Sequence, residues 1–136
     1  MSKHKCRFAA VQCIDFRFRK VTEEYLTQSF GTDSFDLYSW PGAAKKIADL
    51  KTRDTYMKDV AVCASLHSAE RLLLVSHLDC GAYGGTQAFS SVDEEKKKLS
   101  ADLREARDYI RQLFPKLTVE LVLLDTYQGN SFLKID

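Results

Sequence analysis

The stretch that decides the fold is RLLLVSHLDC, which runs from Arg71 to Cys80. Its apolar part, Leu72 to Val75, contains no polar residue. A strand of this kind is typical of the interior of a parallel sheet, where helices cover both faces. His77 and Cys80 therefore stand where this strand is expected to end.

Other segments with the composition of strands alternate with helical patterns. Strands are expected at 8–12, 35–40, 71–76 and 118–124, and helices at 21–30, 52–67 and 93–114. Gly31 is placed to end the first helix, and Pro115 marks the end of the last one. This alternation predicts an α/β fold whose parallel sheet has right-handed crossovers, in a single domain over residues 1–136.

The helix expected at 93–114 has one apolar face. That face consists of Leu99, Leu103, Ala106, Ile110 and Leu113. Asp93 and Glu94 favour the N-terminus of this helix through the helix dipole. We interpret the charged run 94–98 as a solvated helix start and not as a binding patch.

The composition excludes several classes of partner. The chain has 136 residues, 45% of them hydrophobic and 29% charged, with a net charge of +1. This charge gives no reason to expect nucleic acid or an anionic membrane as a partner. The apolar runs fall far short of the roughly 20 residues that span a bilayer, and no signal peptide is evident. We expect a cytoplasmic protein with reduced cysteines.

Two of the expected strands end in residues that bind metals. The first runs into Cys13-Ile-Asp15-Phe-Arg17, and the third runs into His77-Leu-Asp-Cys80. If these strands are neighbours, Cys13, His77 and Cys80 meet at the carboxyl edge of the sheet and form a ligand set suited to zinc. Three protein ligands leave a fourth position, as in catalytic zinc sites. The alternative is that both cysteines are small buried hydrophobic residues and that His77 is a hydrogen-bonded loop residue.

Asp15 and Arg17 lie two residues apart, so in an extended segment they project to the same side. Asp15 is either the fourth zinc ligand or a hydrogen-bond acceptor for a water on the metal. In the second case Arg17 would pair with the carboxylate and hold it off the metal. The simplest alternative is a loop ion pair, which contributes little if it is exposed.

Together these residues resemble the β-class carbonic anhydrases. Cys13-Ile-Asp-Phe-Arg17 is similar to the family's Cys-x-Asp-x-Arg motif, and His77-Leu-Asp-Cys80-Gly-Ala82 is similar to its His-x-x-Cys-Gly-Ala motif. A strand that ends in Trp40-Pro-Gly-Ala43 lies between them, as in the family. The resemblance covers roughly residues 7 to 125.

The resemblance implies a mainly parallel four- to five-stranded sheet flanked by helices. It implies Zn²⁺ held by Cys13, His77 and Cys80, with Asp15 and Arg17 as the catalytic pair beside the metal. The reaction would be the reversible hydration of CO2 to bicarbonate. The family also implies a homodimer or an oligomer built from dimers.

Ile14 and Phe16 are bulkier than the residues that the family has in this motif. With Phe18, Trp40 and Tyr83, Phe16 predicts a narrow apolar pocket, although core packing is the simpler role for such aromatics. An apolar pocket suits CO2 but also COS or CS2, so a hydrolase of these compounds is one alternative. The other is a non-catalytic zinc-binding protein in which Asp15 completes the coordination shell.

A few other residues have simpler interpretations. His67 and Tyr83 are candidates for proton transfer, although a structural role is the expectation for both. Cys6 and Cys63 are expected to take no part in metal binding. Gly81 is expected to let the backbone turn tightly next to the metal.

Overall fold

Five strands form one sheet in a computed structural model that describes residues 4–127 and 129–136. The strand order is β2-β1-β3-β4-β5. Their bounds are Phe8–Cys13 for β1, Asp36–Trp40 for β2, Arg71–His77 for β3, Thr118–Asp125 for β4 and Ser131–Ile135 for β5. The first four strands are parallel, and β5 runs antiparallel to β4. The predicted α/β fold with a mainly parallel sheet is confirmed.

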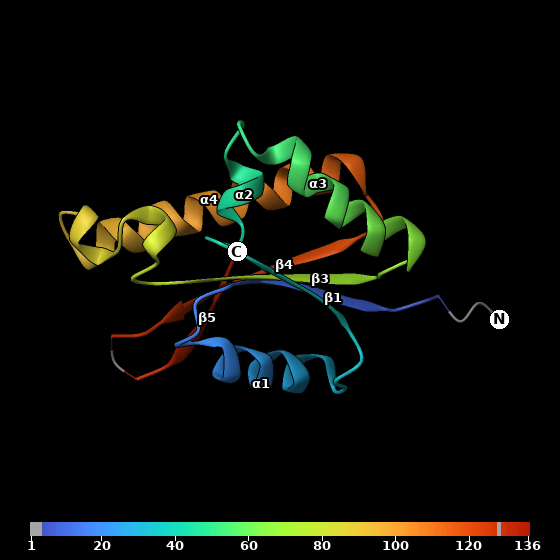
Figure 1. Cartoon of the computed structure of the whole chain (residues 1–136), viewed down its shortest axis with the longest axis horizontal. Helices are drawn as coiled ribbons and strands as arrows, with labels where there is room; N and C mark the ends of the chain where they lie inside the picture. Colours follow the sequence, from blue (N-terminus) through green and yellow to red (C-terminus); the bar gives the residue numbers. More distant parts are fainter. Residues whose placement is uncertain (1–3, 128) are drawn as a thin grey trace.

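Helices cover both faces of this sheet (Figure 1). α1 (Arg19–Phe30) lies on one face, and α2 (Lys45–Ala48), α3 (Arg53–Ala61) and α4 (Val92–Leu113) lie on the other. The α-helix expected at 52–67 ends at Ala61 and continues as a π-helical turn over Val62–Leu66, where the His67 N–H donates to Val62 O. None of the helices within 4–127 and 129–136 combines the length and hydropathy needed to cross a membrane.

β3 is the centre of the sheet, and every residue from Leu72 to His77 is buried. Leu72 and Leu74 belong to the core beneath α2–α4, whereas Leu73 and Val75 belong to the core beside α1. Successive side chains of a strand point to opposite faces. Because both faces of β3 pack against a core, consecutive residues of this strand are apolar.

α4 is the long helix that covers the larger core. Ser91 caps it, because its hydroxyl oxygen accepts a hydrogen bond from the Glu94 N–H at 3.1 Å. Four residues of the predicted apolar face are fully buried. The fifth, Leu113, is 52% exposed because the helix ends there.

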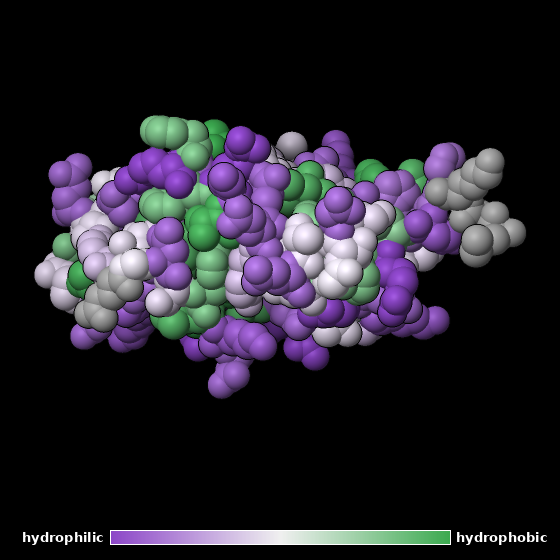
Figure 2. All heavy atoms as spheres, turned by 90° about the horizontal axis from the view of Figure 1, so that it is seen from below, coloured by the Kyte–Doolittle hydropathy of each residue, from purple (hydrophilic) through white to green (hydrophobic). Residues whose placement is uncertain are grey.

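α1 covers its face of the sheet alone. It ends at Gly31, whose left-handed φ of 71° lets its N–H donate to Thr27 O, as the sequence predicts. A groove of about 550 Å³ lies beside this helix and is lined by Tyr25, Val122 and Lys134, among others. Figure 2 looks at the molecule from below and shows hydrophobic side chains between the hydrophilic ones. This face is therefore only partly covered within one chain.

The strand order brings the carboxyl ends of β1, β2 and β3 to one edge. Cys13 pairs with Trp40 at the end of β2, and His77 is the last residue of β3. β1 lies between β2 and β3. The loops after these strands, which carry both metal-binding motifs, are therefore neighbours.

Candidate metal centre

Cys13, His77 and Cys80 form one cluster at this edge of the sheet. Their ligand atoms all lie within 4.8 Å of one another, and the two Sγ atoms are 3.9 Å apart. Tetrahedral zinc with Zn–S bonds of about 2.3 Å sets two thiolates roughly 3.8 Å apart. The spacing of the sulfurs therefore fits one metal ion between them.

His77 presents its Nε2 atom to this cluster. Its Nδ1 lies 2.7 Å from Leu78 O, and since a carbonyl only accepts, Nδ1 must carry the proton. This tautomer leaves a lone pair on Nε2, which is buried and has no hydrogen-bond partner. A buried polar atom without a partner is costly. A metal ion on Nε2 would remove that cost.

The two thiols share one negative charge. The hydrogen bond from Cys80 is the largest effect and lowers the pKa of Cys13 to about 4, while the same contact raises the pKa of Cys80. The pKa of His77 is also raised: burial lowers it, but the contacts with Cys13 and Leu78 O outweigh burial. The cluster thus attracts positive charge. A divalent cation would let both sulfurs ionise.

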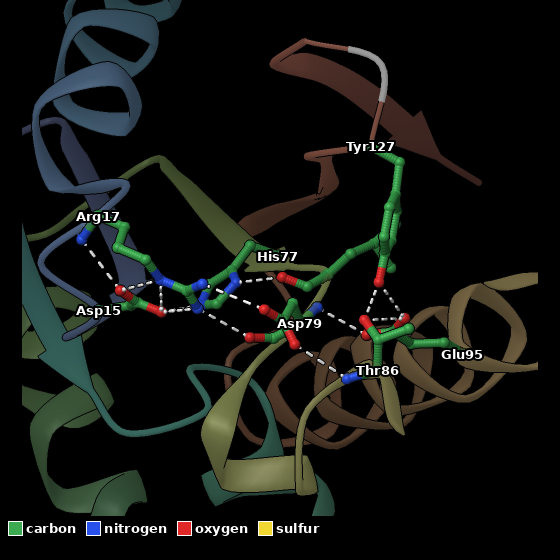
Figure 3. Close-up of polar contacts among 8 residues, drawn as sticks. Asp15, Arg17, His77, Asp79, Thr86, Glu95 and Tyr127 are labelled. Atoms are coloured by element: carbon green, nitrogen blue, oxygen red, sulfur yellow. Dashed lines mark hydrogen bonds and ion pairs between the residues drawn. The ribbon is translucent and has the colours of Figure 1, made fainter. Parts of the chain in front are cut away.

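Arg17 holds Asp15 through both carboxylate oxygens (Figure 3). Asp15 Oδ1 accepts from the Arg17 backbone N–H at 3.0 Å and from Nε at 3.1 Å. Asp15 Oδ2 accepts from Nη2 at 2.7 Å and lies 3.7 Å from His77 Nε2. Asp15 is therefore next to the cluster, with its orientation set by a guanidinium and not by the cluster itself.

Arg17 also binds Asp79, which belongs to the loop after β3. Nη1 donates to Asp79 Oδ2 at 3.1 Å, and Nη2 donates to Asp79 O at 3.0 Å. The side chain of Arg17 therefore connects the loop after β1 to the loop after β3. Asp79 adopts a φ of 58°, a left-handed conformation that is uncommon for residues other than glycine.

An open cleft of about 710 Å³ lies over these loops. Its lining includes Cys13, Asp15 and the apolar residues Ile14, Phe16 and Pro41. Ile14 is 56% exposed and Phe16 is 86% exposed, so both are at the surface. The expected apolar lining is present at this rim, but Phe16 is the one predicted aromatic that lines the cleft.

The other predicted aromatics have structural contacts. Trp40 Nε1 donates to Asp59 Oδ2 at 3.1 Å, and the Tyr83 hydroxyl donates to Asp102 Oδ2 at 2.6 Å. Phe18 packs against the His77 ring with a centroid distance of 4.8 Å. Core packing, the simpler alternative, therefore explains Trp40 and Tyr83, while Phe18 helps to fix the imidazole.

His67 lies at the opposite edge of the sheet from the cluster. Its Nδ1 contacts Asp36 Oδ2 at 2.6 Å, and Asp36 is the first residue of β2. The contact with Asp36 agrees with the structural role expected for His67, which is not among the residues that line the cleft. Cys6 and Cys63 lie outside the Cys13–His77–Cys80 cluster, the sole group of this kind in the described part of the chain.

Gly42, and not Gly81, is the glycine that the site needs. A Cβ on Gly42 would come within 2.9 Å of the Ala82 Cβ, and its φ is +84°. It lets the loop after β2 pack against the loop after β3. A Cβ on Gly81 would meet no described atom of the chain within 4 Å, so the packing of the chain does not itself require glycine there.

Sequence reasoning missed two residues that hold the site together. Asp79 is one of the two residues between His77 and Cys80, but the sequence does not show the backbone conformation that turns it toward Arg17. Glu95 is completely buried, although the charged run 94–98 predicted a solvated helix start. At Glu95 that prediction was wrong, because this carboxylate accepts the Asp79 N–H at 2.7 Å.

Replacing Arg17 by glutamine is expected to raise the pKa of Asp15. Hydrogen bonds from Arg17 are the largest cause that holds this pKa below its ordinary value of 3.8. A lowered pKa means that the ionised group stabilises the fold above the ordinary value, and that this contribution is lost as the pH falls through the folded-state value. A ¹³C NMR titration of the Asp15 carboxyl in metal-free protein measures the shift.

Arg19→Gln is the matched control, because Arg19 pairs with Glu23 at 3.8 Å, whereas the carboxylate of Asp15 is held by Arg17. It should leave the titration of Asp15 unchanged. An Asp15 pKa that is the same in wild type and in Arg17→Gln would contradict the role given to Arg17.

Comparison with known proteins places this geometry in a family. The family model described as "Putative carbonic anhydrase" matches residues 3–130. An uncharacterized protein of Rickettsia conorii is 30% identical over 122 residues, which are 84% of this chain and 64% of that protein. One of Rickettsia bellii is 28% identical over 120 residues, 84% of this chain and 73% of that protein. The chain thus spans less than two thirds of the first relative.

Solved structures share the fold. The β-carbonic anhydrase CafA of Aspergillus fumigatus gives a TM-score of 0.67 at 11% identity, over 96% of this chain and 76% of that chain. A carbonic anhydrase from Glaciozyma antarctica gives 0.63 at 16% identity, over 96% of this chain and 82% of that chain. With the family model, this likeness leads to one conclusion: the chain belongs to the carbonic anhydrase family, as a divergent member with the β-class fold.

Proposed function

We propose that this protein is a zinc-dependent carbonic anhydrase that catalyses the reversible hydration of CO2 to bicarbonate. The observation that carries this proposal is the double hold of Arg17 on Asp15. Both carboxylate oxygens of Asp15 accept hydrogen bonds from Arg17 next to a cluster of two thiols and one imidazole. A carboxylate held in this way is an acceptor beside the metal position and leaves a coordination position for a small ligand.

Cys13, His77 and Cys80 are the residues that would hold zinc. Two sulfurs 3.9 Å apart and a buried imidazole Nε2 without a partner suit a tetrahedral ion. When bound, zinc lowers the pKa of water toward 7 and so supplies a hydroxide nucleophile at neutral pH. The bond from Nδ1 to Leu78 O keeps His77 in the tautomer that binds a metal through Nε2.

Asp15 and Arg17 then have separate roles. Asp15 accepts a hydrogen bond from a water in the cleft and orients it, since its Oδ2 is 3.7 Å from His77 Nε2. Hydrogen bonds from Arg17 hold the Asp15 pKa below its ordinary value of 3.8, so Asp15 stays ionised further into the acid range. Arg17 also holds the carboxylate away from the metal. Both effects keep the Asp15 carboxylate available as a hydrogen-bond acceptor beside the metal position.

The cleft suits an uncharged linear substrate. Ile14, Phe16 and Pro41 give its rim an apolar surface. The guanidinium of Arg17, the one basic group among the described residues that line the cleft, already binds Asp15 and Asp79. Because Arg17 is already paired with two carboxylates, it does not retain an anionic product such as bicarbonate, which is released to solvent.

Two alternatives share this site. In a non-catalytic zinc protein, Asp15 would leave Arg17 and complete the coordination shell, at the cost of its hydrogen bonds to the guanidinium. In a hydrolase for COS or CS2, the same apolar rim would admit the sulfur compound. Sulfide release from COS or CS2 by the zinc-loaded protein identifies the hydrolase, and its absence removes that alternative.

Stopped-flow CO2 hydration by the zinc-loaded protein tests the proposal. We expect activity well above the buffer rate and a fall of about 10- to 100-fold in Asp15→Asn, which keeps the shape but weakens the acceptor. Asp33→Asn is the matched control, because Asp33 is exposed in the turn between α1 and β2. Wild-type activity no higher than that of Asp15→Ala, with equal zinc content, would contradict the proposed function.

We also infer that the chain forms a homodimer. β2 and β5 are the edge strands of the sheet, and a free strand edge favours pairing with another chain. The groove beside α1 leaves one sheet face partly covered. Sedimentation velocity at micromolar concentration should give a species of twice the chain mass of 15.5 kDa. A single species of one chain mass across the concentration series would contradict the dimer.

A further inference from the structure

Glu95 is a fully buried carboxylate outside the cluster of metal-binding residues. It lies in the first turns of α4 and has no exposed surface. Its Oε2 accepts the backbone N–H of Asp79 at 2.7 Å, and its Oε1 accepts the Thr86 hydroxyl at 2.9 Å. The Tyr127 hydroxyl lies 3.5 Å from Oε1. A carboxylate with no exposed surface needs such donors, because an isolated buried charge is very costly.

The Asp79 backbone is held in an unfavourable conformation at the point where Glu95 binds it. Its φ of 58° is left-handed, a conformation that residues other than glycine adopt infrequently, although Asp tolerates it better than most. The short bond from the Asp79 N–H to Glu95 Oε2 holds the backbone in this conformation. A second bond, from the Thr86 N–H to Asp79 Oδ1 at 3.0 Å, fixes the side chain.

Asp79 in turn presents two acceptors to Arg17. In this conformation Asp79 O and Oδ2 both face the guanidinium and accept from Nη2 and Nη1 (Figure 3). The same guanidinium holds Asp15. Hydrogen bonds therefore connect Glu95 on α4 to Asp15 beside the metal-binding cluster, through Asp79 and Arg17. This series of hydrogen bonds does not require Glu95 to touch the metal or a substrate.

We propose that Glu95 is a positioning residue: by holding the Asp79 backbone, it orients Arg17 and so keeps Asp15 beside the metal and off it. Its effect on turnover rests on the proposed function. Its effect on the geometry of Arg17 does not, and this part is measurable without any activity. Glu95 is thus a third carboxylate of the site, contributed by a helix that carries neither metal-binding motif.

The test compares Glu95→Leu with Glu95→Gln in the zinc-loaded full chain. Leucine has a similar size but no acceptor, so the Asp79 N–H loses its partner. The amide oxygen of glutamine still accepts from Asp79, and its NH₂ group donates to the Thr86 hydroxyl oxygen. Glu94→Leu is the matched control, because Glu94 is the exposed neighbour in the same helical turn.

Solvent exchange of the Arg17 Nε–H, followed by NMR, is the first readout. We expect exchange at least about tenfold faster in Glu95→Leu, because Nη1 and Nη2 lose their fixed acceptors on Asp79 and the guanidinium then no longer holds Nε on Asp15. Wild-type exchange is expected in Glu95→Gln and Glu94→Leu. The second readout is CO2 hydration at equal zinc content. There kcat should fall by about 10-fold in Glu95→Leu and recover in Glu95→Gln.

Wild-type exchange of the Arg17 Nε–H in folded Glu95→Leu would overturn the proposal, as would a failure of Glu95→Gln to restore it. If Glu95→Leu does not fold, exchange of the Asp79 amide in wild type decides: protection supports the contact with Glu95, and exchange at the rate of an unstructured amide overturns it. An inactive wild type with the expected exchange pattern would contradict the proposed function but leave the positioning role intact.

Discussion

The site depends on one side chain, Arg17, which binds a carboxylate on each of two loops. Its planar guanidinium offers several donors in a fixed arrangement, and here they reach Asp15 after β1 and Asp79 after β3. Lysine has a single point charge and could not hold both in this geometry. Without this bond network, Asp15 would be free to turn toward a cation in the Cys13–His77–Cys80 cluster. The choice between a closed metal site and an open one is therefore made at Arg17.

The sheet topology makes that contact possible. Cys13 and Cys80 are 67 residues apart in the chain, yet their sulfurs are in contact because β1 and β3 are parallel neighbours that end at the same edge. The buried strand β3 fixes the position of His77, and Phe18 packs against its ring. α4 contributes Glu95, which binds the Asp79 N–H in the loop after β3. Strands and a helix thus supply Cys13, His77 and Glu95. The loop residues Asp15, Arg17 and Asp79 are held by hydrogen bonds.

The sequence predicted four parallel strands, because it has four apolar runs that alternate with helical patterns. It also predicted that Cys13, His77 and Cys80 converge, because the carboxyl ends of parallel strands meet at one edge of a sheet. The short β5 and α2 could not be predicted, since their patterns are weak without the packing that stabilises them. Glu95 was beyond prediction, because the charged run around it indicates exposure to solvent. The single domain over 1–136, the cytoplasmic location and the metal identity stay predictions.

Zinc is proposed to bind Cys13, His77 and Cys80 and to keep a fourth position for an oxygen ligand. Zinc K-edge X-ray absorption of the zinc-loaded protein tests this proposal most directly, with Cys80→Ser as the comparison. We expect two sulfur ligands, one imidazole and one light atom in wild type at pH 8.5. Cys80→Ser should lose most of its bound zinc, because a hydroxyl is a poor zinc ligand. A wild-type spectrum without sulfur ligands, or unchanged zinc content in Cys80→Ser, would contradict it.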